Sequence, residues 1–156
     1  MYYFAYGSNM DPNQMEKRCP LSKSVSIAIL PHYELHFPRR SKKRNCGVAS
    51  IMQCNGKNVW GVIYDIPNKV DFNNLDKKEG FYGEGNPQNC YERKHRVFYL
   101  DGDKKNRIMA DTYIALLVPN NPFLPSPEYL KTIINGANSH NLPNHYVNEL
   151  SQILTK

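Results

Sequence analysis

The sequence predicts an α+β protein in which a curled or closed, antiparallel-rich sheet is flanked by about four helices. Two observations support this fold class. The 156 residues include 11 Tyr and 6 Phe, an aromatic content that favours strands. Strand-like runs also outnumber helical segments and do not alternate with them regularly, which disfavours a doubly wound parallel sheet. The length fits one domain that spans residues 1–156.

Strands are predicted at seven short runs, several of which place β-branched and aromatic residues at alternate positions. Asn55-Gly56 lies between two of these runs and predicts a hairpin, because both central positions of a type I′ turn need positive φ. Asp101-Gly102 predicts a second such turn between the last two runs. The predicted strands are Tyr2–Tyr6, Val25–Leu30, Tyr33–Phe37, Gly47–Met52, Val59–Ile66, Arg93–Tyr99 and Met109–Val118.

Helices are predicted at four places. Asp11 and Ser126 can each cap a helix, and the proline that follows each of them fits the first helical turn. Gly80 suits the left-handed residue at the end of the second helix. Apolar residues of the last two helices recur at helical spacing. We predict helices from Pro12 to about Arg18, from near Asp71 to Gly80, from Pro127 onward and from near Pro143 onward.

The composition argues against several classes of protein. No apolar run reaches the roughly 18 residues of a membrane-spanning helix. The start, Met1-Tyr2-Tyr3-Phe4, lacks the basic region of a signal peptide, so we expect a cytoplasmic protein with no membrane partner. The four cysteines show no C-x-x-C spacing, which predicts free thiols. Because no phosphate-binding loop, dinucleotide fingerprint or metal-ligand pattern is present, we predict neither a cofactor nor a metal.

Basic residues are concentrated in one stretch. The formal net charge is +6, and much of the excess lies in Arg39-Arg40-Ser41-Lys42-Lys43-Arg44. Such a run can bind nucleic acid or an anionic substrate, although it is also typical of a solvated loop. Aromatic residues do not interleave with it in a single-strand-binding pattern, so we expect no nucleic-acid partner.

The segment Tyr6-Gly7-Ser8-Asn9 joins the first strand to the first helix. Gly7 permits a close approach of the backbone to a ligand. Backbone N–H groups at such a turn, next to a helix start, favour an anion such as a carboxylate or a developing oxyanion. An ordinary strand-to-helix turn is the alternative.

Glu79 lies near the end of the second predicted helix. It shares a helical face with Phe72 and Leu75, so it turns inward if those two residues face the core. Its position at the negative end of the helix dipole and its partial burial would both raise its pKa toward the range useful for proton transfer. The alternative is a structural glutamate that pairs with a lysine.

Three motifs occur in order along the chain. The first is Tyr6-Gly7-Ser8-Asn9, and the second is Leu75-Asp76-Lys77-Lys78-Glu79-Gly80. The third comprises Pro125-Ser126-Pro127-Glu128-Tyr129, Gly136-Ala137, Leu142-Pro143 and Tyr146. Each motif alone is weak, but in this order they resemble the γ-glutamylcyclotransferase family. The resemblance extends from residue 3 to about residue 150 and implies a small α+β fold built on a β-barrel.

The resemblance also implies a cofactor-free enzyme. In this reaction the α-amine of a γ-glutamyl amide attacks its own γ-carbonyl, and 5-oxoproline and a free amine are released. Glu79 would be the general acid and base, while the turn at Tyr6, Gly7, Ser8 and Asn9 would hold the substrate through backbone donors. Met10, where the family often has Leu, would form an apolar pocket wall. Further candidate pocket residues, for which core packing is the alternative, are Tyr91, Tyr113 and Tyr129.

The motifs describe the glutamyl half of a substrate better than its leaving amine. We therefore expect a small-molecule γ-glutamyl partner whose amine is an amino acid, an isopeptide lysine, a polyamine or part of a protected metabolite. A basic, catalytically silent nucleic-acid-binding domain is the non-enzymatic alternative. The sequence leaves open whether the protein is a monomer or a homodimer.

Overall fold

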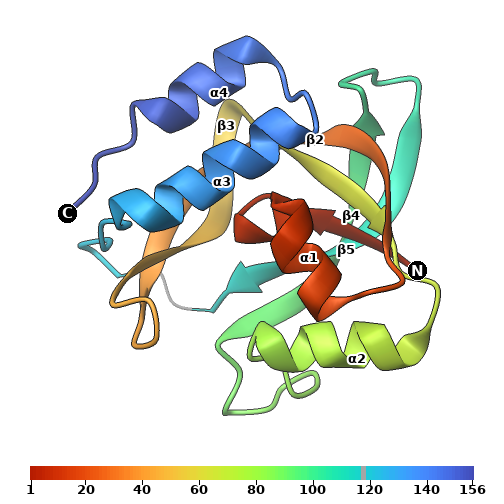
Figure 1. Cartoon of the computed structure of the whole chain (residues 1–156), viewed down its shortest axis with the longest axis horizontal. Coiled ribbons are helices and arrows are strands. Elements are labelled where there is room, and N and C mark those ends of the chain that lie inside the picture. The colour runs from red at the N-terminus through yellow and green to blue at the C-terminus, as the bar shows by residue number, and fades with distance from the viewer. Residues whose placement is uncertain (117–118) are drawn as a thin grey trace.

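The computed structural model describes residues 1–116 and 119–156. In these residues five strands close into a barrel in the order β1-β3-β2-β4-β5 (Figure 1). Neighbouring strands are antiparallel, except that β1 and β5 run parallel where Tyr3 pairs with Asp111. The predicted α+β barrel with about four helices is therefore confirmed. The strands are β1 (Tyr2–Ala5), β2 (Lys23–Ser41), β3 (Cys46–Asp65), β4 (Tyr91–Leu100) and β5 (Arg107–Ala115).

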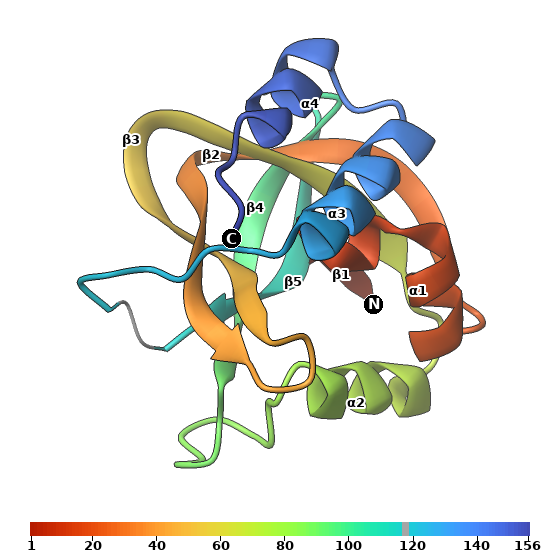
Figure 2. The ribbon, with the colours of Figure 1, turned by 60° about the vertical axis from the view of Figure 1, so that its left-hand side comes forward.

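The prediction of four separate strands between residues 25 and 66 is wrong. β2 contains both Val25–Leu30 and Tyr33–Phe37, and β3 contains both Gly47–Met52 and Val59–Ile66. The two long strands pair from Lys23 opposite Asp65 to Ser41 opposite Cys46. Residues 42–45 join them, so the basic run covers the end of β2 and most of the tip of a hairpin that projects from the barrel (Figure 2).

The predicted hairpin turn at Asn55-Gly56 is also wrong. Tyr33 pairs with Gln53 and Pro31 pairs with Asn58, so the four residues 54–57 lie opposite the single residue His32. Gly56 does adopt a left-handed φ of 83°, as the dipeptide indicates, but it serves a bulge within β3. A bulge bends the paired strands and increases their twist, which helps a sheet to close. The conformation of Gly56 was therefore predictable, whereas that of Asn55 and the place of the segment in the sheet depended on the partner strand.

The second predicted turn is confirmed. Asp101 and Gly102 both have positive φ, at 53° and 74°, and they begin the connection from β4 to β5. β5 starts two residues before the predicted run Met109–Val118 and ends at Ala115. The last two residues of that predicted run lie outside the described residues.

The helix starts follow the predicted caps. The Asp11 carboxylate accepts hydrogen bonds from the N–H groups of Asn13 and Gln14, and Ser126 accepts one from Tyr129. A 3-10 turn, η1 (Ser8–Met10), connects β1 to the first helix. No helix within the described ranges has the length and apolar character needed to cross a membrane. The helices are α1 (Pro12–Arg18), α2 (Lys69–Lys78), α3 (Pro127–Ser139) and α4 (Asn144–Ser151).

The end of α2 fixes the position of Glu79. Glu79 is the C-cap residue, and Gly80 follows it with a left-handed φ of 68°. The N–H of Phe81 donates to the carbonyl of Asp76 at 2.8 Å, and the N–H of Gly80 donates to that of Lys77 at 3.1 Å. These paired bonds form a Schellman motif, which stops the helix at a defined residue. The predicted glycine stop is confirmed, although α2 begins two residues before the predicted Asp71.

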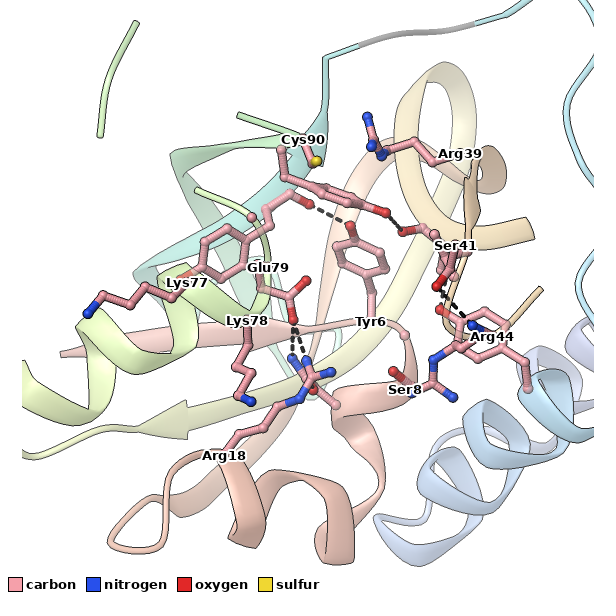
Figure 3. Close-up of a pocket in the computed structure, with 18 of the residues that line it drawn as sticks. Tyr6, Ser8, Arg18, Arg39, Ser41, Arg44, Lys77, Lys78, Glu79 and Cys90 are labelled. Atoms are coloured by element: carbon pink, nitrogen blue, oxygen red, sulfur yellow. Dashed lines mark hydrogen bonds and ion pairs between the residues drawn. The ribbon is translucent and has the colours of Figure 1, made fainter. Parts of the chain in front are cut away.

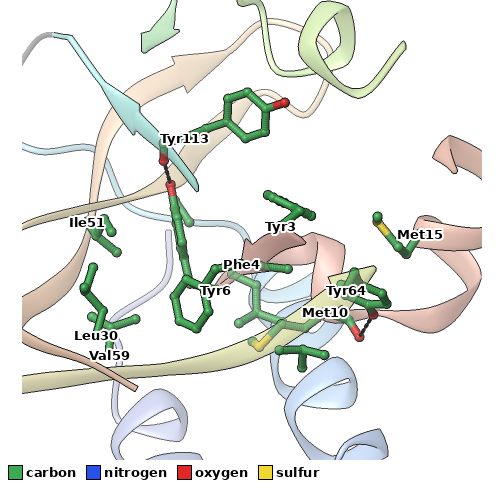
Figure 4. Close-up of a cluster of buried hydrophobic side chains, with 14 of the residues drawn as sticks. Tyr3, Phe4, Tyr6, Met10, Met15, Leu30, Ile51, Val59, Tyr64 and Tyr113 are labelled. Carbon is green, nitrogen blue, oxygen red and sulfur yellow. Dashed lines mark hydrogen bonds between the residues drawn. The ribbon is translucent and has the colours of Figure 1, made fainter. Parts of the chain in front are cut away.

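Buried aromatic and aliphatic side chains fill the barrel and the space beneath α3 (Figure 4). Phe4 of β1 stacks on Phe98 of β4 with ring centroids 4.3 Å apart. Helix α3 packs closely on η1, because a Cβ atom at Gly136 would lie only 2.5 Å from the backbone carbon of Met10. The glycine thus allows α3 to contact the backbone of the segment that follows β1.

We predict that Gly136→Ala destabilises the protein, although alanine normally stabilises a helix relative to glycine by about 1 kcal/mol. The added methyl meets backbone, which cannot rotate away, and overpacking of this kind costs about 1–3 kcal/mol. Urea denaturation followed by circular dichroism measures the free energy of unfolding. Asn135→Ala, at an exposed position of the same helix, is the matched control and should change stability little. Stabilisation by Gly136→Ala would contradict the close packing of α3 on η1.

Candidate active site

A cavity of about 480 Å³ opens between the turn after β1, the β2–β3 hairpin, the end of α2 and the start of β4 (Figure 3). The structure brings Glu79 and the Tyr6–Asn9 turn together here, although they are about 70 residues apart in the sequence. The predicted tyrosines Tyr91, Tyr113 and Tyr129 line the same cavity. The separate sequence motifs thus meet at one place.

Met10 is the predicted site residue that lies elsewhere. It is fully buried in the hydrophobic core and is absent from the cavity lining among the described residues (Figure 4). The tight 3-10 turn places its backbone directly against Gly136 of α3. The expectation that Met10 forms a pocket wall therefore needs correction, because it supports the turn from behind.

Two side chains hold the Glu79 carboxylate. The same oxygen, Oε1, accepts hydrogen bonds from Arg18 at 2.6 Å and from the Asn9 side-chain amide at 2.9 Å. Oε2 has no hydrogen-bond partner among residues 1–116 and 119–156. The carboxylate is therefore fixed through one oxygen, and the other is left for a ligand. Its ion-pair partner is Arg18 of α1, whereas the structural alternative anticipated a lysine.

Asn9 is the central connection of this cluster. Its buried amide nitrogen donates to both the Tyr3 hydroxyl and Glu79, each at 2.9 Å. Its amide oxygen accepts hydrogen bonds from Gln14 and Arg18, each at 2.8 Å. The side chain of Asn9 therefore orients Glu79, while its backbone belongs to the turn. Sequence reasoning missed Gln14 and Arg18, and the only signal for them was that α1 begins immediately after the turn.

The turn itself presents unpaired backbone donors. Met10 N–H donates to the Gly7 carbonyl, as expected within a 3-10 turn. The first N–H groups of a helical turn have no partner within it. In the part of the chain that the structure describes, the N–H groups of Gly7, Ser8 and Asn9 receive no acceptor from elsewhere either. They therefore remain available to an anionic group in the cavity.

The cavity tyrosines are held by hydrogen bonds to their surroundings. Tyr6 donates to the Tyr113 carbonyl, and Tyr91 donates to the Ala49 carbonyl at 2.9 Å. The Tyr129 hydroxyl accepts the Ala49 N–H at 3.1 Å. Burial raises the pKa of each of these phenols above its ordinary value, so they stay neutral at physiological pH. They form a rigid, uncharged wall.

A second carboxylate, Asp76, lies behind this wall. Its two oxygens accept hydrogen bonds from Tyr113 at 2.6 Å and Arg93 at 2.8 Å. Burial raises the pKa of the Asp76 carboxyl above its ordinary value, although Tyr113 and Arg93 act in the opposite direction. Asp76 does not line the cavity, so it positions Tyr113 from behind. The sequence placed Asp76 within a motif and gave no sign of this pairing.

The fold and this cavity define a class of small closed-barrel proteins with one oriented carboxylate facing a strand-to-helix turn. The sequence model of the AIG2-like family matches residues 58–150, which is more than half of the chain. The human and mouse proteins named γ-glutamylcyclotransferase are 32% and 30% identical over 97% of this chain and 77% of their own length. A solved structure named γ-glutamyl cyclotransferase superposes with a TM-score of 0.88 at 28% identity, covering 100% of this chain and 89% of that one. The chain therefore belongs to the AIG2-like, or γ-glutamylcyclotransferase, family, as its motifs indicate.

We predict that Arg18 and Glu79 are energetically coupled. Arg18→Gln or Glu79→Gln alone leaves one charge without its partner, whereas the double variant removes both charges. Because both side chains are about one-fifth exposed, at 21% and 18%, we expect a coupling energy of about 1–2 kcal/mol in a double-mutant cycle measured by urea denaturation. The pair Lys57–Glu34, whose lysine is 64% exposed, is the control and should show a much weaker coupling. Equal coupling in the two pairs would show that burial does not strengthen the Arg18–Glu79 interaction.

Proposed function

We propose that this protein is a γ-glutamylcyclotransferase, which converts a γ-glutamyl amide to 5-oxoproline and a free amine. One observation carries the proposal: a carboxylate held through a single oxygen lies in the same cavity as three unpaired backbone N–H groups. The first feature suits proton transfer, and the second suits the binding of carboxylate or oxyanion. The human and mouse relatives that bear the name γ-glutamylcyclotransferase support the same conclusion.

Glu79 would transfer two protons from the attacking nitrogen to the leaving nitrogen, one after the other. The α-ammonium group of the substrate gives a proton to the Glu79 carboxylate, and the freed amine attacks the γ-carbonyl to form a five-membered ring. Glu79 then gives this proton to the nitrogen of the leaving amine as its bond to the γ-carbon breaks. The regenerated carboxylate takes the second proton from the ring nitrogen and passes it to the released amine, which departs as an ammonium ion. Atoms and charge balance without water, and the steps as written need no cofactor. General acid–base help of this kind is worth about 10²–10⁴-fold in rate.

Arg18 and Asn9 would keep Glu79 in position through both transfers. They bond Oε1, which leaves Oε2 to exchange the proton with the substrate. A fixed carboxylate matters because the nucleophile and the electrophile belong to one molecule, and the enzyme must select its folded-back conformer. Both positioning groups come from the segment that begins at the turn, so the base and the substrate-binding turn would share one support.

The turn would bind the glutamyl half of the substrate. Three N–H groups that need no reorganisation can hold the α-carboxylate or stabilise the oxygen of the tetrahedral intermediate. The neutral tyrosines exclude water from the other side, and Tyr113 is held in place by Asp76. Among the alternatives for the leaving amine, a polyamine fits poorly. The rest of the cavity is rich in Arg and Lys, and these positive charges would repel a positively charged polyamine.

We predict that Glu79→Gln lowers kcat for γ-glutamyl-alanine by at least about 100-fold, because glutamine keeps the shape of the side chain but cannot accept the proton. Release of 5-oxoproline, measured by chromatography, reports the rate. Glu84→Gln, in the exposed loop after α2, is the control and should keep wild-type activity. Circular dichroism verifies that both variants are folded. Full activity in folded Glu79→Gln would exclude Glu79 as the acid and base.

A further inference from the structure

The cavity carries far more positive charge than the glutamyl group requires. Apart from Arg18, which is paired with Glu79, six basic residues line it, and Glu79 is the only carboxylate among the described lining residues. A bound glutamyl group offers one α-carboxylate. The six residues are Arg39, Arg40, Lys42, Arg44, Lys77 and Lys78.

None of these six residues forms a salt bridge with a carboxylate in residues 1–116 and 119–156. Four come from the β2–β3 hairpin and two from the last turn of α2, so two elements supply them. Figure 3 shows Arg39 and Arg44 on the hairpin and Lys77 and Lys78 on α2. Like charges that face one cavity repel one another and raise its positive potential. A site of this kind gains stability when it binds an anion.

Arg39 is the most informative member of the group. Its side chain is half-buried, and its guanidinium lies 5.9 Å from the centre of the Tyr91 ring. The Arg39 guanidinium has no hydrogen-bond partner within the described part of the chain. A half-buried guanidinium with unused donors is costly unless a ligand supplies the acceptor, and its planar fork matches a carboxylate.

Arg44 has a complementary position on the same hairpin. Its guanidinium lies 4.8 Å from the centre of the Tyr129 ring and donates to the Gln14 side chain at 2.8 Å. Gln14 in turn donates to Ser8 and Asn9, so this hydrogen-bond chain connects the hairpin to the turn. Arg44 is thereby oriented, and it lines the same cavity as Arg39.

From this arrangement we propose that the hairpin forms a subsite for an acidic leaving amine that carries two carboxylates, as glutamate does. The inference rests on the proposed function, since it assigns the other half of the same substrate. Arg39 and Arg44 contact the carboxylates, and Arg40, Lys42, Lys77 and Lys78 add attraction at the rim. The basic run of the sequence is then neither a solvated loop nor a nucleic-acid site.

The test compares two substrates that have the same shape. In γ-glutamyl-glutamate the leaving group has two carboxylates, and in γ-glutamyl-glutamine it has one. We expect kcat/KM to be about tenfold higher for γ-glutamyl-glutamate, since a charged hydrogen-bond pair in a half-buried site is worth about this factor. The preference should shrink as NaCl rises from about 25 mM to about 500 mM, because salt screens the rim charges.

Variants identify the subsite. Arg39→Gln should reduce the glutamate-to-glutamine preference to about twofold or less, and Arg39→Lys should restore part of it. Arg40→Gln/Lys42→Gln removes two exposed charges, so it tests the rim even if Arg39 variants fail to fold. The matched control, Lys104→Gln/Lys105→Gln, removes the same charge from the β4–β5 connection, roughly 30 Å away along β4, and should leave the preference unchanged.

The outcomes separate the two proposals. If no γ-glutamyl compound yields 5-oxoproline, the proposed function fails. If both substrates are converted at equal kcat/KM, the function stands and the acidic subsite is overturned. Equal loss of activity toward both substrates in Arg39→Gln would instead assign Arg39 to the glutamyl α-carboxylate. Competitive inhibition by a single-stranded oligonucleotide, without a glutamate preference, would assign the rim to nucleic acid and also overturn the subsite.

Discussion

The arrangement of the cavity depends on the contact between Asn9, Arg18 and Glu79. Asn9 lies just before α1, and Arg18 is the last residue of that helix. Glu79, which both residues contact, follows the end of α2 far along the chain. The buried amide of Asn9 and the guanidinium of Arg18 bond the same oxygen of Glu79 and also bond each other. These contacts fix the position of the end of α2 relative to the turn and α1. Because each partner would otherwise be a partly buried polar group without compensation, the cluster is stable only as a whole.

The surrounding fold supplies the precision that this contact requires. The Schellman motif at Gly80 ends α2 at one residue, so Glu79 cannot shift along the helix. On the other side, α3 packs on the backbone of Met10 through Gly136 and fixes η1. Neither glycine carries a functional side chain, yet each one determines where a group of the candidate site stands. The third motif of the sequence is therefore structural support for the first.

Local signals in the sequence predicted local features well. The caps at Asp11 and Ser126, the glycine stop at Gly80 and the inward face of Glu79 depend on neighbouring residues only. Features that depend on a partner strand were mispredicted, as Asn55-Gly56 shows: Gly56 has the positive φ of a turn residue, but Asn55 does not, and the pairing of β3 makes the segment a bulge. The partners of Glu79 were also hidden, since nothing near Arg18 in the sequence indicates a glutamate 61 residues away.

The cavity has two halves with different origins. The turn, Asn9 and Glu79 belong to the ordered motifs that place the chain in its family. In the proposed function, these residues would contact the atoms that every γ-glutamyl amide shares. The tip of the hairpin, residues 42–45, lies beyond the last β2–β3 pair, Ser41 opposite Cys46, so it can vary without disturbing the barrel. In the proposed function, charge at that tip would therefore select the leaving amine while the geometry of proton transfer stays fixed. Gln14 connects Arg44 of the hairpin to Ser8 of the turn by hydrogen bonds, which keeps the two halves in register.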